Sequence, residues 1–320
     1  MKEFRIIAPS MSLSENDKTK IVKAEQYFKS LGYSLTLGKY IFDKDAYFGC
    51  SSIKNRVEDL MNAFLDKNVE IIVCADGGYN VNQILPYLDY EIIKQNPKII
   101  IGYSDITALL IAIMKKTSLT TYNGPMLSGF SSDNEYTLQY FEKILENKDF
   151  MIHSSKEIYD YKKVNNKMEK VTLKNDGMVA IQNGEAFGKI IGGNLCTINL
   201  LQGTEYMPNL NDSILFLEDD ADDFGTDVFL LEFDRNLESL LQLPNCNIKG
   251  IVFGRFQLCS NMTIDKLKAI IRNKEKLKDI PIVCGADFGH TNPMFTIPIG
   301  AYCNLKIKNN DIEIKIEMGK

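Results

Sequence analysis

The chain has 320 residues, of which 45% are hydrophobic and 25% charged, a balance typical of folded proteins that excludes a disordered chain. The net charge of −5 argues against nucleic acid or an anionic membrane as partner, because proteins that bind these usually carry a basic excess. No apolar run approaches the roughly 20 residues that span a bilayer, so no membrane segment is expected.

Seven cysteines are scattered singly along the sequence, and no C-x-x-C pair occurs, which excludes a zinc ribbon or a thioredoxin-type site. Scattered reduced thiols, together with an N-terminus that lacks a signal-peptide pattern, predict a cytoplasmic protein. A catalytic histidine has only two candidates, His153 and His290.

The first half alternates short apolar runs with helical patterns. Strands are predicted at 4–8, 33–37, 69–74 and 98–102, and helices from Ser12 or Ser14 to about 31 and at 55–67, 81–87, 105–115 and 133–147. This alternation predicts an α/β fold built on a doubly wound parallel sheet.

The composition changes after about residue 150. Residues 154–176 are rich in Lys and Asn, which predicts a linker or mobile loop between two domains. We therefore expect a first domain over 1–150, a linker or loop over 151–180 and a second domain over 181–320. In the second domain, strands are predicted at 188–191, 213–217, 248–253 and 280–284, helices at 197–201, 227–241 and 263–274, and an antiparallel hairpin at 301–317.

Ser104 lies between a predicted buried strand and a helix. Open α/β sheets bind ligands at the carboxyl ends of their strands, and a helix N-terminus at that edge favours an anion. This placement is typical of a nucleophile elbow, although Ile106 stands where the G-x-S-x-G pattern has its second glycine. The alternative is that Ser104 only caps the helix.

A second strand-to-helix turn has the sequence Asp76-Gly77-Gly78-Tyr79-Asn80. Paired glycines let the backbone approach a ligand closely, and their N–H groups could bind an oxyanion. The alternative is a tight turn with no ligand. Nucleotide phosphate binding is not predicted, because neither G-x-G-x-x-G nor G-x-x-x-x-G-K-[ST] occurs.

Two further candidates follow strands of the second half. Glu218 ends a strand, where a carboxylate could orient a histidine; the alternatives are a solvated acidic loop or a hard-cation site, whose usual spacing is absent. His290 lies in a turn-rich loop after a strand, a place suited to a general base, whereas His153 is expected on the surface. Ser104, Glu218 and His290 together predict a Ser-His-Glu triad, which is recognised by roles rather than by chain order.

Several stretches of the chain then resemble one serine peptidase family, that of the LD-carboxypeptidases and the MccF-like microcin C self-immunity proteins. The matching stretches are IIAPS, CADGGYNVNQILPYLDYEIIKQNPKIIIGYSDITALL, GKIIGGNL, LFLED and DFGHTNPMFTIPIG, and they extend over most of the sequence. The resemblance implies a flavodoxin-like N-terminal domain and a smaller β-rich α/β C-terminal domain. It also implies a homodimer and a Ser-Glu-His triad at the domain interface, with no metal and no cofactor.

Carried over to this chain, the resemblance makes Ser104 the nucleophile, His290 the general base and Glu218 the residue that orients His290. The backbone N–H groups of Gly78 and Asp105 would form the oxyanion hole.

The glycine turn separates two branches of that family. LD-carboxypeptidases typically have RGGYG there, whereas DGGYN in this chain is closer to the self-immunity branch. That branch cleaves the amide between an aminoacyl group and a modified nucleotide, and it stacks the base on a tryptophan. Since this chain has no tryptophan, Tyr159 or Tyr161 is expected to stack the base instead. The turn residues Asp76, Gly77 and Tyr79 are expected to contact the substrate.

The expected function is therefore that of a serine carboxypeptidase or amidase that hydrolyses aminoacyl-nucleotide antibiotics. One alternative is an LD-carboxypeptidase that removes the terminal D-Ala from a murein tetrapeptide during peptidoglycan recycling. A second alternative is a small-molecule binding protein that has the fold without the catalysis.

Overall fold

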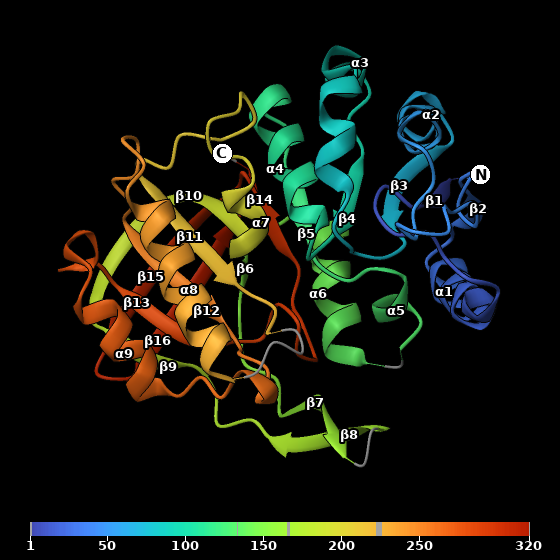
Figure 1. Cartoon of the computed structure of the whole chain (residues 1–320). Helices are drawn as coiled ribbons and strands as arrows, with labels where there is room; N and C mark the ends of the chain where they lie inside the picture. Colours follow the sequence, from blue (N-terminus) through green and yellow to red (C-terminus); the bar gives the residue numbers. More distant parts are fainter. Residues whose placement is uncertain (1, 133, 165–166, 222–225, 320) are drawn as a thin grey trace. The chain divides into compact units, whose positions relative to one another are not determined.

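The computed structural model describes residues 2–132, 134–164, 167–221 and 226–319 (Figure 1). The chain divides into two compact units. Unit 1 comprises Met1–Leu138, Leu200–Pro208 and Thr296–Gly300; unit 2 comprises Gln139–Asn199, Asn209–Phe295 and Ala301–Lys320. The division thus falls earlier than the expected residue 150, unit 2 is no smaller than unit 1, and two short segments of the second half belong to unit 1.

Unit 1 is built on a six-stranded sheet in the order β14-β5-β4-β3-β1-β2. Its strands are β1 (Glu3–Ile7), β2 (Ser34–Leu37), β3 (Val69–Cys74), β4 (Ile99–Gly102), β5 (Thr121–Asn123) and β14 (Ile297–Ile299). The strands β1 to β5 are parallel, and β14 adds to β5 in the antiparallel direction. The order 2-1-3-4-5 is that of flavodoxin-like folds and confirms the predicted doubly wound sheet.

Helices cover both faces of this sheet, which explains why its central strands are continuous apolar runs (Figure 1). On one face lie α1 (Lys18–Ser30), which follows the 3-10 turn η1 (Glu15–Asp17), and α5 (Leu127–Phe130); on the other lie α2 (Ile53–Leu65), α3 (Tyr90–Gln95) and α4 (Ile106–Thr117). The helix predicted at 81–87 is the 3-10 helix η2 (Val81–Tyr87), which contains Pro86. Helix α6 (Glu135–Glu146) crosses the boundary between the units.

Unit 2 contains an eight-stranded sheet in the order β6-β16-β15-β10-β11-β12-β13-β9. Its parallel centre consists of β10 (Gly184–Asn194), β11 (Ser213–Glu218), β12 (Gly250–Gly254) and β13 (Ile282–Ala286). The flanking strands β6 (Phe150–Met151), β9 (Val179–Gln182), β15 (Tyr302–Lys308) and β16 (Asp311–Glu317) run antiparallel to their neighbours, and β15 and β16 form the predicted terminal hairpin. The helical elements are α7 (Leu195–Asn199), α8 (Thr226–Leu241), α9 (Ile264–Arg272), η4 (Leu258–Ser260) and η5 (Glu275–Leu277).

The segment expected to be a linker is instead a β-hairpin of unit 2. Strand β7 (Glu157–Val164) pairs antiparallel with β8 (Lys167–Lys174). The linker prediction was wrong because a two-stranded hairpin outside the main sheets needs few apolar side chains, so its composition resembles that of a loop. The hairpin is tied to unit 2 by Tyr159, whose N–H donates to Asn292 O at 2.7 Å and whose carbonyl accepts from Asn292 N at 3.1 Å.

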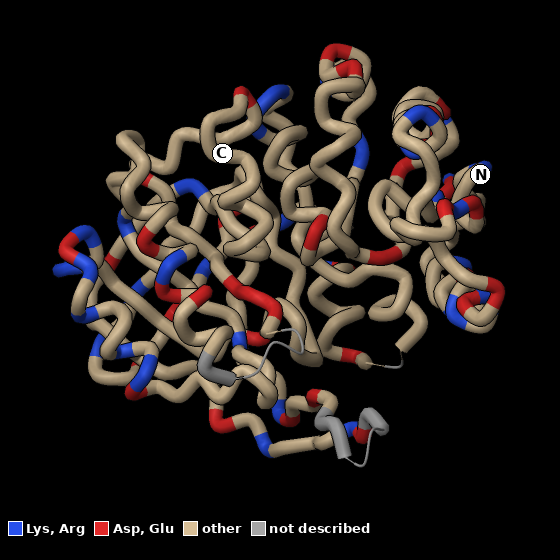
Figure 2. Tube along the Cα trace, in the orientation of Figure 1, with Lys and Arg blue, Asp and Glu red and all other residues tan. Residues whose placement is uncertain are grey.

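Among the described helices, none has both the length and the apolar character to cross a membrane. Figure 2 shows Lys and Arg interspersed with Asp and Glu along the trace of both units.

Gly192 in β10 occupies a place that no larger residue fits, since an added Cβ would lie 1.9 Å from Phe216 O on the paired strand β11. Gly192→Ala therefore forces two central strands apart, and we expect the free energy of unfolding to fall by about 3 kcal/mol. Chemical denaturation measures this change.

The matched control is Gly319→Ala, because an added Cβ at Gly319 has no heavy atom within 4 Å. We expect it to change the free energy of unfolding by less than about 0.5 kcal/mol. A Gly192→Ala variant as stable as the wild type would contradict the described contact between β10 and β11.

Candidate active site

Loops of unit 1 converge at the carboxyl ends of the adjacent strands β1, β3 and β4. They carry Ser10, the glycine turn 76–80 and Ser104. In this strand order the connections change direction between β1 and β3, and open α/β sheets bind ligands at such switch points. The position of Ser104 agrees with the prediction that was made from this rule.

Ser104 has a φ of +61°, in the left-handed region that residues other than glycine rarely adopt. The N-cap position of α4 is Asp105, with a φ of −52°, and its side chain makes no capping hydrogen bond. Gly102, two residues before Ser104, has no room for a side chain, since an added Cβ would lie 2.9 Å from Ile106 Cγ2. A serine in a strained turn between a buried strand and a helix is the geometry of a nucleophile elbow.

The glycine turn lies directly against Ser104. An added Cβ at Gly77 would lie 3.1 Å from Ser104 Oγ and 3.8 Å from the backbone nitrogen of Asp105. Gly78 has a φ of +141°, and an added Cβ there would lie 2.6 Å from Ser10 Oγ. Within the part of the chain that the structure describes, the N–H groups of Gly78 and Asp105 have no hydrogen-bond acceptor, which leaves both able to bind an oxyanion.

Glu218 and His290 lie together at the carboxyl ends of the parallel strands of unit 2. Glu218 is the last residue of β11, His290 follows β13, and His290 Nδ1 lies 2.7 Å from Glu218 Oε2. The Glu218 side chain is only 2% exposed, which excludes the solvated loop for this residue. Gly254 and Gly289 make room for it, because an added Cβ at either would lie within 2.9 Å of Glu218 Cβ.

The acidic residues after β11 favour the protonated form of His290. Burial by itself lowers the pKa of His290, but the charge and the hydrogen bond of Glu218 outweigh it. Asp220, whose Oδ2 lies 3.7 Å from His290 Nε2, and Asp219 add to this effect, and the pKa of His290 is raised to about 9. Burial, followed by the charge of Glu218, raises the pKa of Asp219 to about 7. The remainder of the acidic run, Asp222 and Asp223, lies outside the described residues.

A partly buried ion pair fixes the loop that carries His290, and it was not predicted from the sequence. Asp287 accepts from Arg255 Nη2 at 2.8 Å, from Ser155 N at 2.7 Å and from Asn175 Nδ2 at 3.1 Å. Ser155 and Asn175 flank the β7–β8 hairpin, so one carboxylate holds the hairpin and the histidine loop together. These partners are separated from Asp287 by up to 132 positions, and no local motif points to them.

The expected substrate contacts belong to both units. In unit 1, Asp76 is exposed at the glycine turn, where its Oδ1 accepts from Gly77 N at 2.9 Å, and Tyr79 is 75% exposed. In unit 2, Tyr161 is 46% exposed on β7. Lys170 Nζ lies over the ring of Tyr159, 3.7 Å from its centroid, in a cation–π contact.

The expected triad is likewise divided, with Ser104 in unit 1 and the pair Glu218–His290 in unit 2. His153 is exposed, as predicted. Across the described ranges, no group of three or more His, Cys, Asp or Glu residues is placed to hold a metal ion.

Known proteins match the chain over nearly its whole length. The family model for the LD-carboxypeptidase N-terminal domain matches residues 4–124, and the model for the LD-carboxypeptidase C-terminal domain matches residues 187–305. A Bacillus subtilis relative named "Putative carboxypeptidase YocD" is 43% identical, over 98% of this chain and 96% of its own length. The microcin C7 self-immunity protein MccF of Escherichia coli is 31% identical, over 93% of this chain and 88% of its own.

Solved structures show the same fold. An MccF-like protein from Bacillus anthracis superposes with a TM-score of 0.93 at 44% identity, covering 99% of this chain and 97% of its own. MccF in complex with aspartyl sulfamoyl adenosine gives 0.83 at 28% identity, with 99% and 96% covered. A muramoyltetrapeptide carboxypeptidase from Oxalobacter formigenes gives 0.77 at 23% identity, with 99% of both chains covered, which shows the shared fold alone. Since the family models match both halves of the sequence, the chain belongs to the serine carboxypeptidases of the LD-carboxypeptidase family, peptidase family S66.

Proposed function

We propose that this protein hydrolyses the amide bond between an aminoacyl group and a modified nucleotide, and so confers self-immunity or resistance to antibiotics of the microcin C type. The observation that carries the proposal is Asp76, an exposed carboxylate at the glycine turn next to Ser104. An aminoacyl group brings an ammonium, which Asp76 attracts, whereas the terminal D-Ala of a murein peptide brings a carboxylate, which Asp76 repels. The 31% identity to MccF over 93% of the chain supports the same reading.

In this proposal Ser104, His290 and Glu218 act as a catalytic triad. His290 Nε2 takes the proton of Ser104 Oγ as Oγ attacks the scissile carbonyl, and the resulting oxyanion accepts hydrogen bonds from Gly78 N and Asp105 N. His290 then gives the proton to the leaving nitrogen, and water hydrolyses the acyl-enzyme. Glu218 holds His290 through Nδ1, so Nε2 is the nitrogen that we assign to the proton transfers.

We assign the stacking of the nucleotide base to Tyr161. Its ring is 46% exposed on β7, whereas the neighbouring Tyr159 ring already carries Lys170. The chain has no tryptophan that could do so. A homodimer in solution is a further part of the proposal, and light scattering of the purified protein tests it.

The second candidate is an LD-carboxypeptidase that releases D-Ala from a murein tetrapeptide. It is supported by the two matching family models, both of which carry the LD-carboxypeptidase name. The triad would be the same and only the substrate would differ. A binding protein without turnover is the third reading, and the presence of Ser104, Glu218 and His290 counts against it.

Covalent labelling with a fluorophosphonate probe tests the triad. We expect Ser104 to be labelled in the wild type, and Ser104→Ala to lose label and to lower kcat at least about 1000-fold, because no other group replaces the nucleophile. His290→Ala should abolish labelling while leaving Ser104 in place. Mass spectrometry locates the label, and a Ser104→Ala variant with near-normal turnover would rule the mechanism out.

The substrate is tested by offering aspartyl sulfamoyl adenosine and a murein L,D-tetrapeptide in parallel, with Ser104→Ala as the blank. We expect release of aspartate, detected by mass spectrometry. Release of D-Ala alone would reject the proposed substrate in favour of the second candidate. Loss of aspartate release in Tyr161→Ala, with Tyr161→Phe as the control that keeps the ring, would support the stacking assignment.

The raised pKa of His290 predicts a pH dependence. Only the neutral imidazole accepts the proton of Ser104, so kcat/KM should rise with pH towards about 9. Glu218→Gln removes the charge that raises the pKa of His290, so the NMR titration of His290 should move to lower pH. His153→Gln assigns the signal and leaves the titration unchanged.

The raised pKa of His290 also predicts that the free energy of unfolding depends on pH. A histidine whose folded pKa lies above its unfolded value of about 6.5 stabilises the folded state at low pH, and this contribution is lost as the pH rises towards about 9. The loss between pH 6.5 and 9 should be smaller in Glu218→Gln. An unchanged NMR titration in that variant would contradict the role given to Glu218.

A further inference from the structure

The side chain of Asp105 makes contacts that its expected role does not use. It is 3% exposed, and its Oδ2 atom accepts from Ser10 Oγ at 2.5 Å and from the N–H groups of Asn80 and Val81, both at 2.9 Å. Ser10 follows β1, Asn80 and Val81 close the turn after β3, and Asp105 follows β4. One carboxylate oxygen therefore joins the loops of three adjacent strands.

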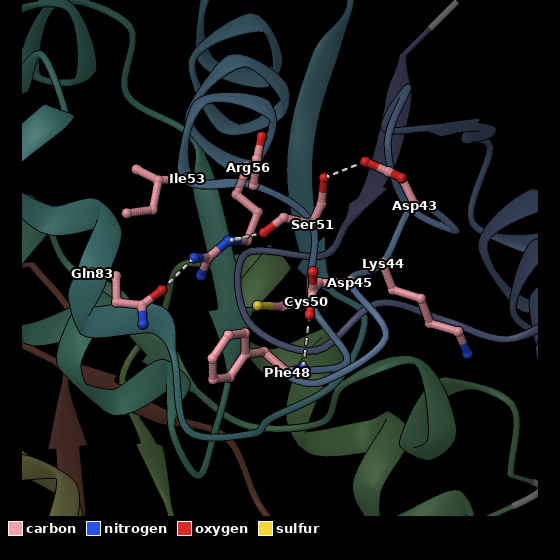
Figure 3. A pocket seen from close by; sticks show the side chains of 10 residues that line it. Asp43, Lys44, Asp45, Phe48, Cys50, Ser51, Ile53, Arg56 and Gln83 are labelled. Atoms are coloured by element: carbon pink, nitrogen blue, oxygen red, sulfur yellow. Dashed lines mark hydrogen bonds between the residues drawn. The ribbon is translucent and has the colours of Figure 1, made fainter.

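A buried arginine donates hydrogen bonds to backbone carbonyl groups of the same loops. Arg56 is 2% exposed, and its Nη1 donates to Pro9 O at 3.0 Å and to Asn80 O at 2.9 Å. Its Nε donates to Ser51 O at 3.0 Å and its Nη2 to Gln83 Oε1 at 2.7 Å, on the wall of a cavity of about 500 Å³ (Figure 3).

Asn80 thus has its N–H bound by Asp105 and its carbonyl bound by Arg56. Burial lowers the pKa of Arg56, and the charge of Asp105 acts in the opposite direction.

Asn80, which is held in this way, lies two residues after Gly78. Ser10 Oγ, which donates to Asp105, also lies against Gly78, where an added Cβ would be only 2.6 Å away. Met11 N donates to Gly77 O at 3.0 Å and ties the same two loops once more. The backbone of Gly78 is therefore fixed relative to Asp105 through Ser10 on one side and through Asn80 on the other.

We propose that the Asp105 carboxylate is a positioning residue for the reaction, because it sets the distance between the two N–H groups of the oxyanion hole. One of these groups is the N–H of Asp105 itself, and the other is carried by the loop that its side chain holds. The proposal rests on the proposed serine hydrolase function and adds Ser10 and Arg56 as the partners of Asp105.

The number of donors on Oδ2 explains why a charged group is suited to this position. Hydrogen bonds to an ionised carboxylate are about twice as strong as neutral ones. Asp105→Asn keeps one oxygen acceptor but removes the charge, whereas Asp105→Ala takes the acceptor from all three donors. The two variants should therefore impair the site to different extents.

The experiment measures kcat, KM and the rate of fluorophosphonate labelling, since the phosphoryl oxygen of the adduct takes the place of the oxyanion. We expect kcat and the labelling rate to fall about 10-fold in Asp105→Asn and about 100-fold in Asp105→Ala, the scale of losing one oxyanion donor, with KM within about threefold. Ser10→Ala should lower both, and Ser10→Thr, which restores a hydroxyl, should recover them.

Asp59→Asn is the matched control. Asp59 is also a buried aspartate of unit 1, and it lies in α2. It accepts from the N–H groups of Lys39 and Tyr40 at 2.9 Å, and the loop that contains these two donors carries no residue of the proposed site. We expect this variant to lose stability in denaturation but to keep kcat within about threefold. If Asp59→Asn lowers kcat as much as Asp105→Asn at equal loss of stability, the effect is structural and the proposal is overturned.

Amide hydrogen exchange of residues 76–81 gives a readout that does not need catalysis. Exchange there should become faster in Asp105→Asn and stay unchanged in Asp59→Asn. Unchanged kcat, labelling and exchange in a folded Asp105→Asn would reject the positioning role. A wild-type protein that neither labels nor turns over would reject the hydrolase function instead, and faster exchange in Asp105→Asn would still support the role of its carboxylate in fixing the loop. Should Asp105→Ala fail to fold, Asp105→Asn and Ser10→Ala carry the test.

Discussion

A carboxylate that is removed from water must find donors or counter-charges in the protein, and this requirement organises the loops of both units. Asp105 gathers the loops after β1 and β3, and Asp287 gathers the hairpin and the histidine loop. Glu218 finds its partner in His290. Each of these side chains is buried at the end of a strand or just after one, where the backbone leaves the sheet and its N–H groups need acceptors.

The two units thus accommodate their buried carboxylates in similar ways. Each has parallel strands that end at one edge, and each replaces side chains by glycine where two loops come too close for a Cβ. Gly77 and Gly78 clear the space around Ser104 and Ser10, while Gly254 and Gly289 clear the space around Glu218. The proposed reactive groups therefore lie at or just after strand ends, where the surrounding backbone supplies hydrogen-bond donors.

The spacing of apolar residues was enough to predict the doubly wound sheet. The positions of Ser104, Glu218 and His290 at or just after predicted strands were enough to select them as candidates. These features are local, since a strand, a turn and a helix start are all visible within about ten residues. The β7–β8 hairpin was missed because its strands lie outside the main sheets, where alternation of apolar and polar residues is not required. Arg56, the side chain of Asp105 and the ion pair of Asp287 with Arg255 were missed because their partners are distant in sequence.

The connection from β13 to β15 carries a consequence for the synthesis of the protein. After His290 the chain enters unit 1, adds β14 to the edge of its sheet beside β5, and returns to unit 2 at Ala301. A growing chain therefore has an incomplete first sheet, with β5 as an open edge, until Ile299 has left the ribosome. The step that adds β14 also closes this edge against unwanted pairing.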